Sequence, residues 1–335
     1  MLSRGNLIQA LLSSGGTCRE KKHAFNIGLI ATFVLSALAH YTHMPTAVQF
    51  SICCISVVFV AAFLGKATES VAHYAGERMG GFLSATFGNA AELIIAIFLI
   101  KDGLFSIVKA SITGSIIGNL LLVLGLSVFL GGLKYKEQNF NVKLAVHNAS
   151  LMLLAVISLF IPATFVGSLT TRETKLMSVT VAGILIAAYL LWLVFSMITH
   201  KKKELGEEQN ESEIPGIVLE DEVHEPQWSK FVSVLYLVLS TVMVAFLSEW
   251  LVGTVEDFAN SFGLSELFVG GFLIAIIGNA AEHSAAVLLA LKNRMGAAVE
   301  IAIGSSLQIA LFVAPVLVII SFFFRPYDGY RIHQL

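Results

Sequence analysis

The sequence predicts an all-α fold, a polytopic bundle of transmembrane helices built from two repeats of inverted topology. Of its 335 residues, 56% are hydrophobic and only 13% are charged, whereas soluble domains carry roughly 25% charged residues. Long apolar runs follow one another along the chain, and one motif occurs twice. A chain this apolar has too few polar residues to cover a surface that faces water, whereas lipid can surround it. The composition therefore excludes a soluble protein.

The apolar runs have the length of membrane-spanning helices, for which about 20 residues are needed. They also lack the period-two alternation of a transmembrane β-barrel. The runs predict about nine helices, at residues 24–41, 46–65, 81–100, 105–131, 145–166, 175–199, 229–252, 267–291 and 298–324.

The segments outside these helices divide the chain. Residues 1–23 are expected to form a cytoplasmic tail, because the apolar stretch after Arg4 is too short for a signal peptide. Residues 24–200 contain a leading helix and the first repeat, and residues 229–335 contain the second. Residues 201–228 begin with three lysines and continue with nine acidic residues. This segment is expected to be a solvated cytoplasmic linker, either a spacer that fixes topology or a regulatory, calcium-sensing segment.

Charge and cysteine usage complete the outline. With the N-terminus in the cytoplasm, fifteen of the 21 lysines and arginines fall on the cytoplasmic side, as the positive-inside rule requires. The net charge of −2 gives no reason to expect a nucleic-acid partner. Cys18, Cys53 and Cys54 form neither a zinc spacing nor a disulfide framework.

A repeated motif indicates how the halves are related. The run Gly80–Glu92 recurs as Gly270–Glu282, and Gly114-Ser115 recurs as Gly304-Ser305 at the same offset along the chain. Five helices separate the starts of the two copies, so the copies run in opposite directions across the membrane. Inverted repeats of this kind are an architecture of secondary transporters, whose binding site lies near the bilayer midplane.

The end of each repeat motif predicts a binding site. A carboxylate in the middle of a membrane costs roughly 3 kcal/mol, and two at symmetric positions imply one shared, doubly charged partner. Each acid follows an asparagine by three residues, which places both on one helical face, and a glycine by four, where backbone can approach an ion or unwind. The candidates are Glu92, Glu282, Asn89, Asn279, Gly88 and Gly278.

Oxygen ligands in this set favour a hard cation such as calcium, which takes about six to eight oxygens. A thiolate or multi-histidine set, which zinc or copper would prefer, is missing from the sequence pattern. Polar side chains of the following helices are candidates to complete the shell, although each could instead bond neighbouring helices. They are Ser115, Ser305 and Gln308, and with less weight Thr113, Asn119 and Ser306.

Four further titratable residues have less defined roles. His283 follows Glu282 but points about 100° away around the helix, and Leu93 fills the matching place in the first copy. His283 is a candidate either for proton transfer or for a hydrogen bond between helices. Glu69 and Glu249 lie in the helices that precede each repeat and are candidates for gating, whereas Glu300 is expected to be structural.

At these residues the chain resembles the calcium/proton antiporter family, also called cation/proton exchangers, of the calcium/cation antiporter superfamily. The resemblance covers residues 25–324, and the Ser-x-Pro-Glu type of motif found in sodium/calcium exchangers is not present. It implies that Glu92 and Glu282 bind calcium or protons in turn, that the second and seventh helices gate access, and that the membrane is a bacterial-type plasma membrane. The matching segments are residues 88–94, 278–283, 118–123 and 299–305.

The family pattern also has one leading helix and two sets of five. Here the second set is expected to stop after the ninth helix, without counterparts of 145–166 and 175–199. We therefore expect this chain to be less stable than a version extended by two helices, unless a neighbouring subunit of a homo-oligomer covers the gap.

The function predicted from the sequence is exchange of calcium for protons by alternating access, with no cofactor beyond the transported ions and with membrane lipid as surroundings. The open alternatives are transport of manganese or another divalent cation, and sodium-coupled calcium exchange. A channel is disfavoured because water selectivity needs no buried acid. An intramembrane metalloenzyme is disfavoured because the sequence has no His-Glu-x-x-His motif.

Overall fold

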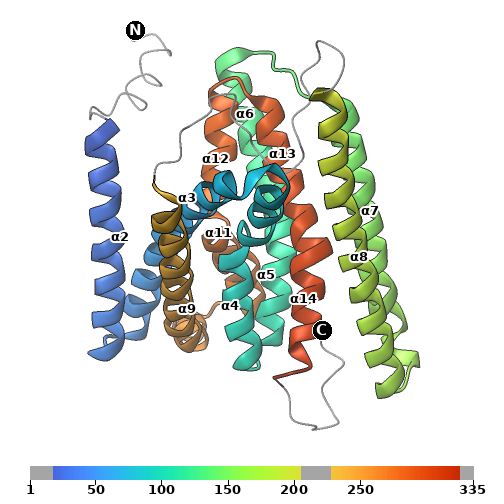
Figure 1. The fold of residues 1–335 in the computed structure, drawn as a ribbon. Coiled ribbons are helices and arrows are strands. Elements are labelled where there is room, and N and C mark those ends of the chain that lie inside the picture. Colours follow the sequence, from blue (N-terminus) through green and yellow to red (C-terminus); the bar gives the residue numbers. More distant parts are fainter. Residues whose placement is uncertain (1–17, 205–227, 325–335) are drawn as a thin grey trace.

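The computed structural model describes residues 18–204 and 228–324, and within them all regular structure is helical (Figure 1). The first half contains α2 (Cys18–Tyr41), α3 (Thr46–Phe87), α4 (Ala90–Lys101), α5 (Phe105–Ile117), η1 (Gly118–Val123), α6 (Leu124–Tyr135), α7 (Val142–Phe165), η2 (Val166–Ser168) and α8 (Thr171–Glu204). The second half contains α9 (Lys230–Ser261), α10 (Glu266–Phe268), η3 (Val269–Ile274), α11 (Ala275–Gly278), α12 (Ala280–Leu291), α13 (Met295–Gln308), η4 (Ile309–Val313) and α14 (Ala314–Ser321).

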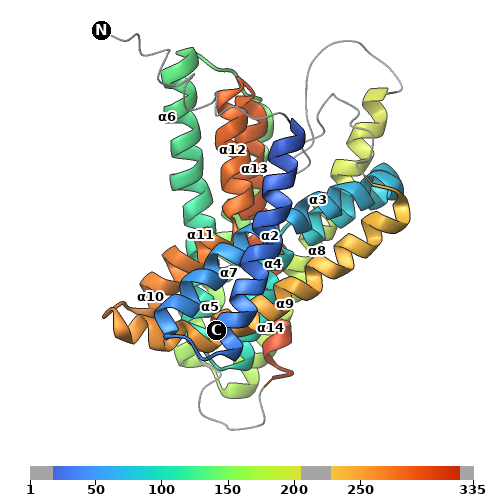
Figure 2. The same cartoon turned by 90° about the vertical axis from the view of Figure 1, so that its left-hand side faces the viewer.

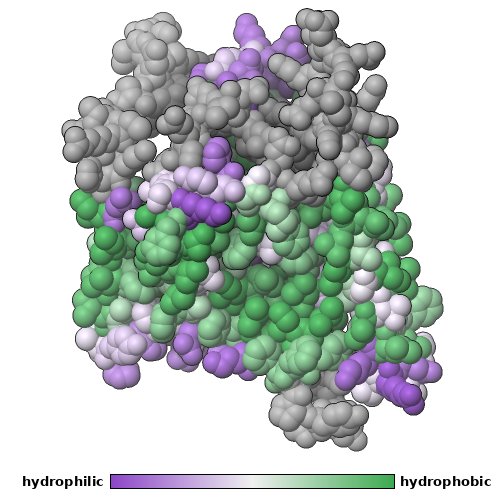
Figure 3. Space-filling view, in the orientation of Figure 1, coloured by the Kyte–Doolittle hydropathy of each residue, from purple (hydrophilic) through white to green (hydrophobic). Residues whose placement is uncertain are grey.

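Seven helices in the described part of the chain are long and apolar enough to cross a membrane, and a bent pair makes an eighth span. The bent pair, Glu266–Gly278 with Ala280–Leu291, turns by 62°. The remaining predicted helix, 81–100, is divided between the end of α3 and α4. A band of apolar side chains crosses the middle of the visible face, with hydrophilic residues at its upper and lower edges (Figure 3). The fold is therefore the predicted transmembrane bundle, with interrupted helices in the repeat motif of each half.

Helix boundaries repeat at the same offset as the sequence motif. Both ends of α12 keep this offset from the ends of α4, and the starts of α13 and α14 keep it from the starts of α5 and α6. The chain rises from α5 to α6 but descends from α13 to α14, and α4 lies in the lower half while α12 lies in the upper half (Figure 1). The two copies are thus inverted, as the sequence predicts.

α3 and α9 pack along each other and contribute to the main apolar core. Ser70 and Ser233 share a buried hydrogen bond of 2.7 Å between these helices, and the rings of Phe50 and Phe258 stack with centroids 4.0 Å apart. α3 bends sharply at Gly76, whose φ of 78° is open to glycine at little cost. The bend sends the second part of α3 across the bundle toward α4.

Three further long helices lie at opposite sides of the molecule (Figure 1). α2 packs on α3 and α9, as Figure 2 shows. α7 and α8 pack against α13 and α14 on the other side of the molecule (Figure 1). Among the described residues, a short turn follows α14. The expected difference in stability between this chain and a longer one is not tested here and stays a prediction. The tail 1–17, most of the acidic linker and residues 325–335 lie outside the described residues.

The two repeats make backbone contact where α5 crosses η3. A Cβ atom at Gly270 would lie 2.6 Å from the carbonyl oxygen of Ile107, and a Cβ atom at Gly114 would overlap the carbonyl of Gly271. Small residues allow membrane helices to approach this closely, and dispersion forces and weak hydrogen bonds then hold them together.

We predict that Gly114→Ala lowers the free energy of unfolding by about 1–3 kcal/mol, because the added methyl group separates α5 from η3. The measurement is thermal unfolding of the detergent-solubilised protein. Gly125→Ala is the matched control, since a Cβ atom at Gly125 meets no atom within 4 Å. Equal melting temperatures for the two variants would show that the contact does not need the glycine.

Candidate functional site

Each predicted glutamate lies in the first turn of a half-helix that begins near the middle of the bundle. The helix breaks at Asn89, with φ −98° and ψ 18°, and again at Asn279, with φ −96° and ψ 6°. Glu92 and Glu282 follow in the first turns of α4 and α12. The unpaired N–H groups at a helix start favour negative charge. The two breaks therefore supply part of the electrostatic compensation that a buried carboxylate requires.

The glycine of each motif lies against the acid of the other copy. A Cβ atom at Gly278 would lie 2.9 Å from Cγ of Glu92, and one at Gly88 would lie 3.9 Å from Oε1 of Glu282. The inverted repeats thus bring together two acids that are far apart in the sequence. Gly278 is needed because a side chain there would overlap the side chain of Glu92, whereas the distance at Gly88 is an ordinary van der Waals contact.

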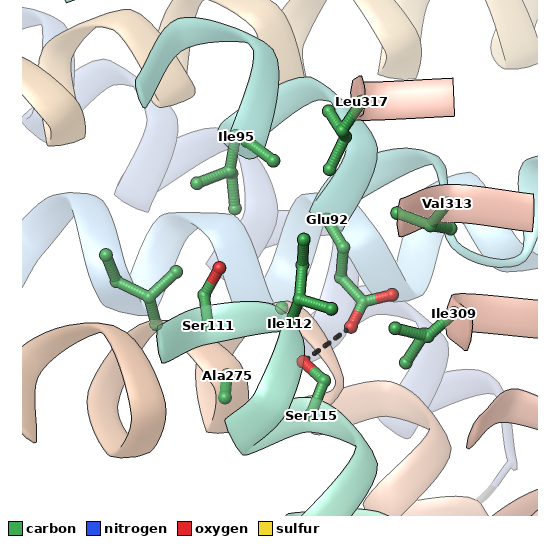
Figure 4. Close-up of a pocket in the computed structure, with 12 residues that line it drawn as sticks. Glu92, Ile95, Ser111, Ile112, Ser115, Ala275, Ile309, Val313 and Leu317 are labelled. Atoms are coloured by element: carbon green, nitrogen blue, oxygen red, sulfur yellow. Dashed lines mark hydrogen bonds between the residues drawn. The ribbon is translucent and has the colours of Figure 1, made fainter. Parts of the chain in front are cut away.

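Hydrogen bonds connect the two copies around Glu92. The Ser115 hydroxyl donates to Oε1 of Glu92 at 3.2 Å, the dashed line in Figure 4, and accepts from Nδ2 of Asn279 at 2.9 Å. Nδ2 of Asn89 donates to Oε1 of Gln308 at 2.6 Å. Four of the predicted site residues are therefore joined to their neighbours across the repeat boundary.

A second set of bonds surrounds Asn119. Its Nδ2 donates to the Ser305 hydroxyl at 3.1 Å, and its Oδ1 is 2.8 Å from Nε2 of His283. The sequence pattern ranks Asn119 below Ser115, yet both are buried and both bond the second repeat. Their spacing of four residues, which places them on one helical face, is the signal that could have raised the rank of Asn119.

Three buried oxygen atoms of this region have no hydrogen-bond donor among the described residues. They are Oδ1 of Asn89, Oδ1 of Asn279 and Oε2 of Glu282. The amide assignments follow from the bonds that the two Nδ2 groups donate. Buried oxygens without a donor are rare and costly, whereas a hard cation takes such oxygens as ligands. These oxygen atoms could therefore serve as ligands of a cation held between the two repeats.

A small cavity of about 20 Å³ adjoins Glu92, with room for about one water molecule. Its polar lining consists of Glu92, Ser111 and Ser115, and the rest is aliphatic (Figure 4). The sequence did not single out Ser111. Its burial in an apolar span is a weak signal, because many serines in membrane helices serve only to bond the helix backbone.

Several candidates lie apart from these contacts. Glu249 pairs with Lys101 at the end of α4 at 3.5 Å, and Glu69 is exposed on α3. Thr113 is exposed as well. Ser306 donates to backbone carbonyls, including that of Ala302 at 2.9 Å, which is a packing role. No group of three or more histidine, cysteine or acidic residues among the described residues could hold a metal ion.

Comparison with known proteins places the chain in a family. The profile of the family described as "Sodium/calcium exchanger protein" matches residues 45–198 and 232–332. The Ca(2+)/H(+) antiporter ChaA of Bacillus subtilis (strain 168) is 46% identical over 301 residues, which are 90% of this chain and 84% of that protein. The Ca(2+)/H(+) antiporter of Synechocystis sp. is 47% identical over 301 residues, 85% of this chain and 79% of that protein.

Two solved structures have a similar fold. The structure of native YfkE superposes with a TM-score of 0.74 at 42% identity and covers 90% of this chain and 82% of the other. The crystal structure of the H+/Ca2+ exchanger CAX shares the fold, with a TM-score of 0.67 over 90% of this chain and 75% of the other, at 14% identity. The resemblance noted from the sequence motifs is therefore confirmed, and the chain belongs to the sodium/calcium exchanger protein family.

Proposed function

We propose that this protein exchanges calcium ions for protons across a membrane, and that Glu92 and Glu282 bind the two ions in turn. The observation that carries the proposal is the cluster of buried oxygens without donors, on Asn89, Asn279 and Glu282, where the two inverted repeats meet. The relatives with 46% and 47% identity are Ca(2+)/H(+) antiporters, which supports both ions.

Charge balance explains why the two ions compete. When both glutamates are ionised, their two negative charges balance the two positive charges of one calcium ion. The amide and hydroxyl oxygens then complete its coordination shell. When the glutamates are protonated, the charge that attracts calcium is lost. The same carboxylate oxygens cannot hold a proton and calcium together, so calcium leaves as protons enter. Exchange follows if each loaded form can turn from one face to the other.

We attribute this change of access, from one face of the membrane to the other, to the inverted repeats. A site between two copies of opposite direction can open to one face through one copy and to the other face through the second. We place the protein in a bacterial-type plasma membrane with the N-terminus in the cytoplasm, because the lysines and arginines favour that orientation. Homo-oligomers, a regulatory role for the linker, and gating by Glu69 and Glu249 remain proposals from the sequence.

Sodium-coupled calcium exchange is the second candidate, because the family as a whole is described as sodium/calcium exchangers. Manganese or another divalent cation is a further candidate cargo, since the same oxygens suit it. An assay of ion coupling distinguishes both from calcium/proton exchange.

We predict that calcium uptake by reconstituted vesicles requires a pH gradient and is independent of sodium. The physical reason is that the proton is the ion that displaces calcium from the glutamates. The measurement is calcium flux with a pH gradient, with a sodium gradient, and with neither, and with manganese as a competing cation. Uptake driven by sodium after the pH gradient is collapsed would move this protein to the sodium-coupled branch.

We predict that Glu92→Gln and Glu282→Gln each reduce calcium uptake to the level of empty vesicles, while the protein still inserts in the membrane. Glutamine keeps the volume of glutamate and removes the charge that balances calcium. Glu137→Gln, at an exposed acid, is the matched control and should transport normally. Either site variant working at the wild-type rate would refute the site.

We predict that Gly278→Ala reduces transport by roughly tenfold to a hundredfold, because its methyl group displaces Glu92 and misplacement by about 1 Å has effects of this size. The control is Gly183→Ala in α8, where a Cβ atom meets no atom within 4 Å. Both variants are assayed by calcium flux at equal protein density. A normal rate for Gly278→Ala would mean that Glu92 does not need its observed position.

A further inference from the structure

The half-helix that carries Glu282 is held at its far end by the other repeat. α12 begins near the middle of the bundle and ends at Leu291, where it meets the end of α6 and the turn that follows α6 (Figure 1). The last carbonyl groups of a helix receive no hydrogen bond within the helix and need donors from elsewhere. At this end of α12, donors come from three side chains of the first repeat.

These three side chains bond the last two residues of α12. Nζ of Lys134 and the Tyr135 hydroxyl both donate to the carbonyl oxygen of Leu291, at 2.6 Å and 3.0 Å. Nε2 of Gln138 donates to the carbonyl oxygen of Ala290 at 2.8 Å. Lys134, Tyr135 and Gln138 are called the clamp below.

The turns on both sides of this contact are shaped to fit it. Asn293, whose Oδ1 accepts a further bond from Nε2 of Gln138 at 3.2 Å, has a φ of 66°, and Lys136 has a φ of 60°. Residues other than glycine persist in this left-handed region where the surrounding structure fixes the backbone. Gly131 lies beside Gln138, because a Cβ atom at Gly131 would overlap Oε1 of Gln138. The glycine therefore leaves the space that the Gln138 side chain occupies.

The repeat shows what the clamp replaces. Lys101, in the last turn of α4, is the counterpart of Leu291. A cation near the C-terminus of a helix stabilises the helix dipole, but α12 has no basic residue of its own in its last turn. Lys134 brings an ammonium group from the first repeat to the carbonyl of the residue that stands in place of Lys101. The counterpart of Lys134 in the second repeat is the apolar Phe324.

α12 is tied to the first repeat at its other end as well. Nε2 of His283 is 2.8 Å from Oδ1 of Asn119 on η1, and η1 runs directly into α6, which ends at the clamp. One continuous helix of the first repeat therefore bonds both ends of the half-helix that carries Glu282. At the equivalent positions α4 and η4 have Leu93 and Ile309, which are apolar.

We propose that Lys134, Tyr135 and Gln138 are positioning residues for ion binding, which fix α12 along its axis and so hold Glu282 in place. α12 has 12 residues and a length of about 18 Å, so a shift at its far end reaches its first turn. A misplacement of about 1 Å is enough to impair a site that depends on orientation. This role rests on the proposed function, in which Glu282 is a ligand of the transported ion.

Two adjacent glycines of α6 provide a test that leaves the clamp residues in the chain. Gly131→Ala puts a methyl group where Oε1 of Gln138 lies, whereas a Cβ atom at Gly132 meets no atom within 4 Å. Gly132→Ala is therefore the matched control, and both substitutions change helix propensity in the same way. Calcium binding is measured by titration calorimetry of the detergent-solubilised protein at fixed pH.

We expect Gly131→Ala to weaken calcium binding at least about tenfold, which corresponds to about 1.4 kcal/mol, and Gly132→Ala to bind like the wild type. Gln138→Ala should weaken binding to a similar degree. In the Gln138→Ala background Gly131→Ala should then have no further effect, because the two changes act through the same contact. Gln138→Ala takes the place of Gly131→Ala if the latter does not fold.

Hydrogen exchange of the calcium-free protein separates a positioning role from a local cap. A local cap would protect only the last turn of α12, at residues 288–291. We expect Gly131→Ala to accelerate exchange also in the first turn, at residues 280–283, and Gly132→Ala to leave it unchanged. Unchanged calcium affinity in Gly131→Ala, or faster exchange confined to the last turn, would overturn the proposal. Exchange needs no calcium, so a wild-type protein that binds no calcium would refute the proposed function separately.

Discussion

Two carboxylates lie buried at the centre of a membrane bundle, and the cost of keeping them there governs the design of the whole molecule. Glu92 and Glu282 cannot stay ionised in a low-dielectric interior without a compensating charge. The helix breaks at Asn89 and Asn279 provide a partial answer, because each directs the start of a half-helix at its own acid. A cation or protons must provide the rest, so the site is stable only when occupied by one or the other.

The inverted repeat explains how one chain builds such a site. Each copy supplies one acid, one asparagine and one glycine, and Gly278 of the second copy leaves the space that Glu92 of the first copy fills. The hydrogen bonds that hold the site also cross between copies, from Asn279 to Ser115 and from Asn89 to Gln308. Half of the candidate site therefore cannot form without the other half, so we expect an ion bound there to depend on the relative position of the two repeats.

The sequence predicted most of the membrane spans and the repeat, because both depend on local composition and on a fixed offset. It also singled out Glu92, Glu282 and their asparagines, which the structure brings to the boundary between the two repeats; their role in ion binding stays a prediction. It offered Gly88 and Gly278 as places where the backbone can unwind, one residue before the observed breaks. It nevertheless treated 81–100 as one span, since hydropathy is insensitive to a change of helix direction, and it did not predict the bend at Gly76. The contacts of Asn119 with Ser305 and His283 join residues far apart in the sequence, and only its spacing of four residues from Ser115 indicates them. The place of Ser111 in the cavity wall likewise depends on distant residues. Glu249 pairs with Lys101 at the end of α4 rather than contacting the site residues, and its gating role is untested.

Departures from symmetry carry as much information as the symmetry itself. His283 has Leu93 as its counterpart, and Ser127 has Leu317. Both differences place a polar residue at a position where the other copy has leucine.

If calcium and protons share the oxygens of Glu92 and Glu282, binding of one ion must release the other. The decisive measurement is proton release on calcium binding by the detergent-solubilised protein, in weakly buffered solution over a range of pH. We expect binding of calcium to release protons, and a protein carrying both Glu92→Gln and Glu282→Gln neither to bind calcium nor to release protons. Calcium binding without proton release at any pH, or proton release that persists in the double variant, would contradict a shared site.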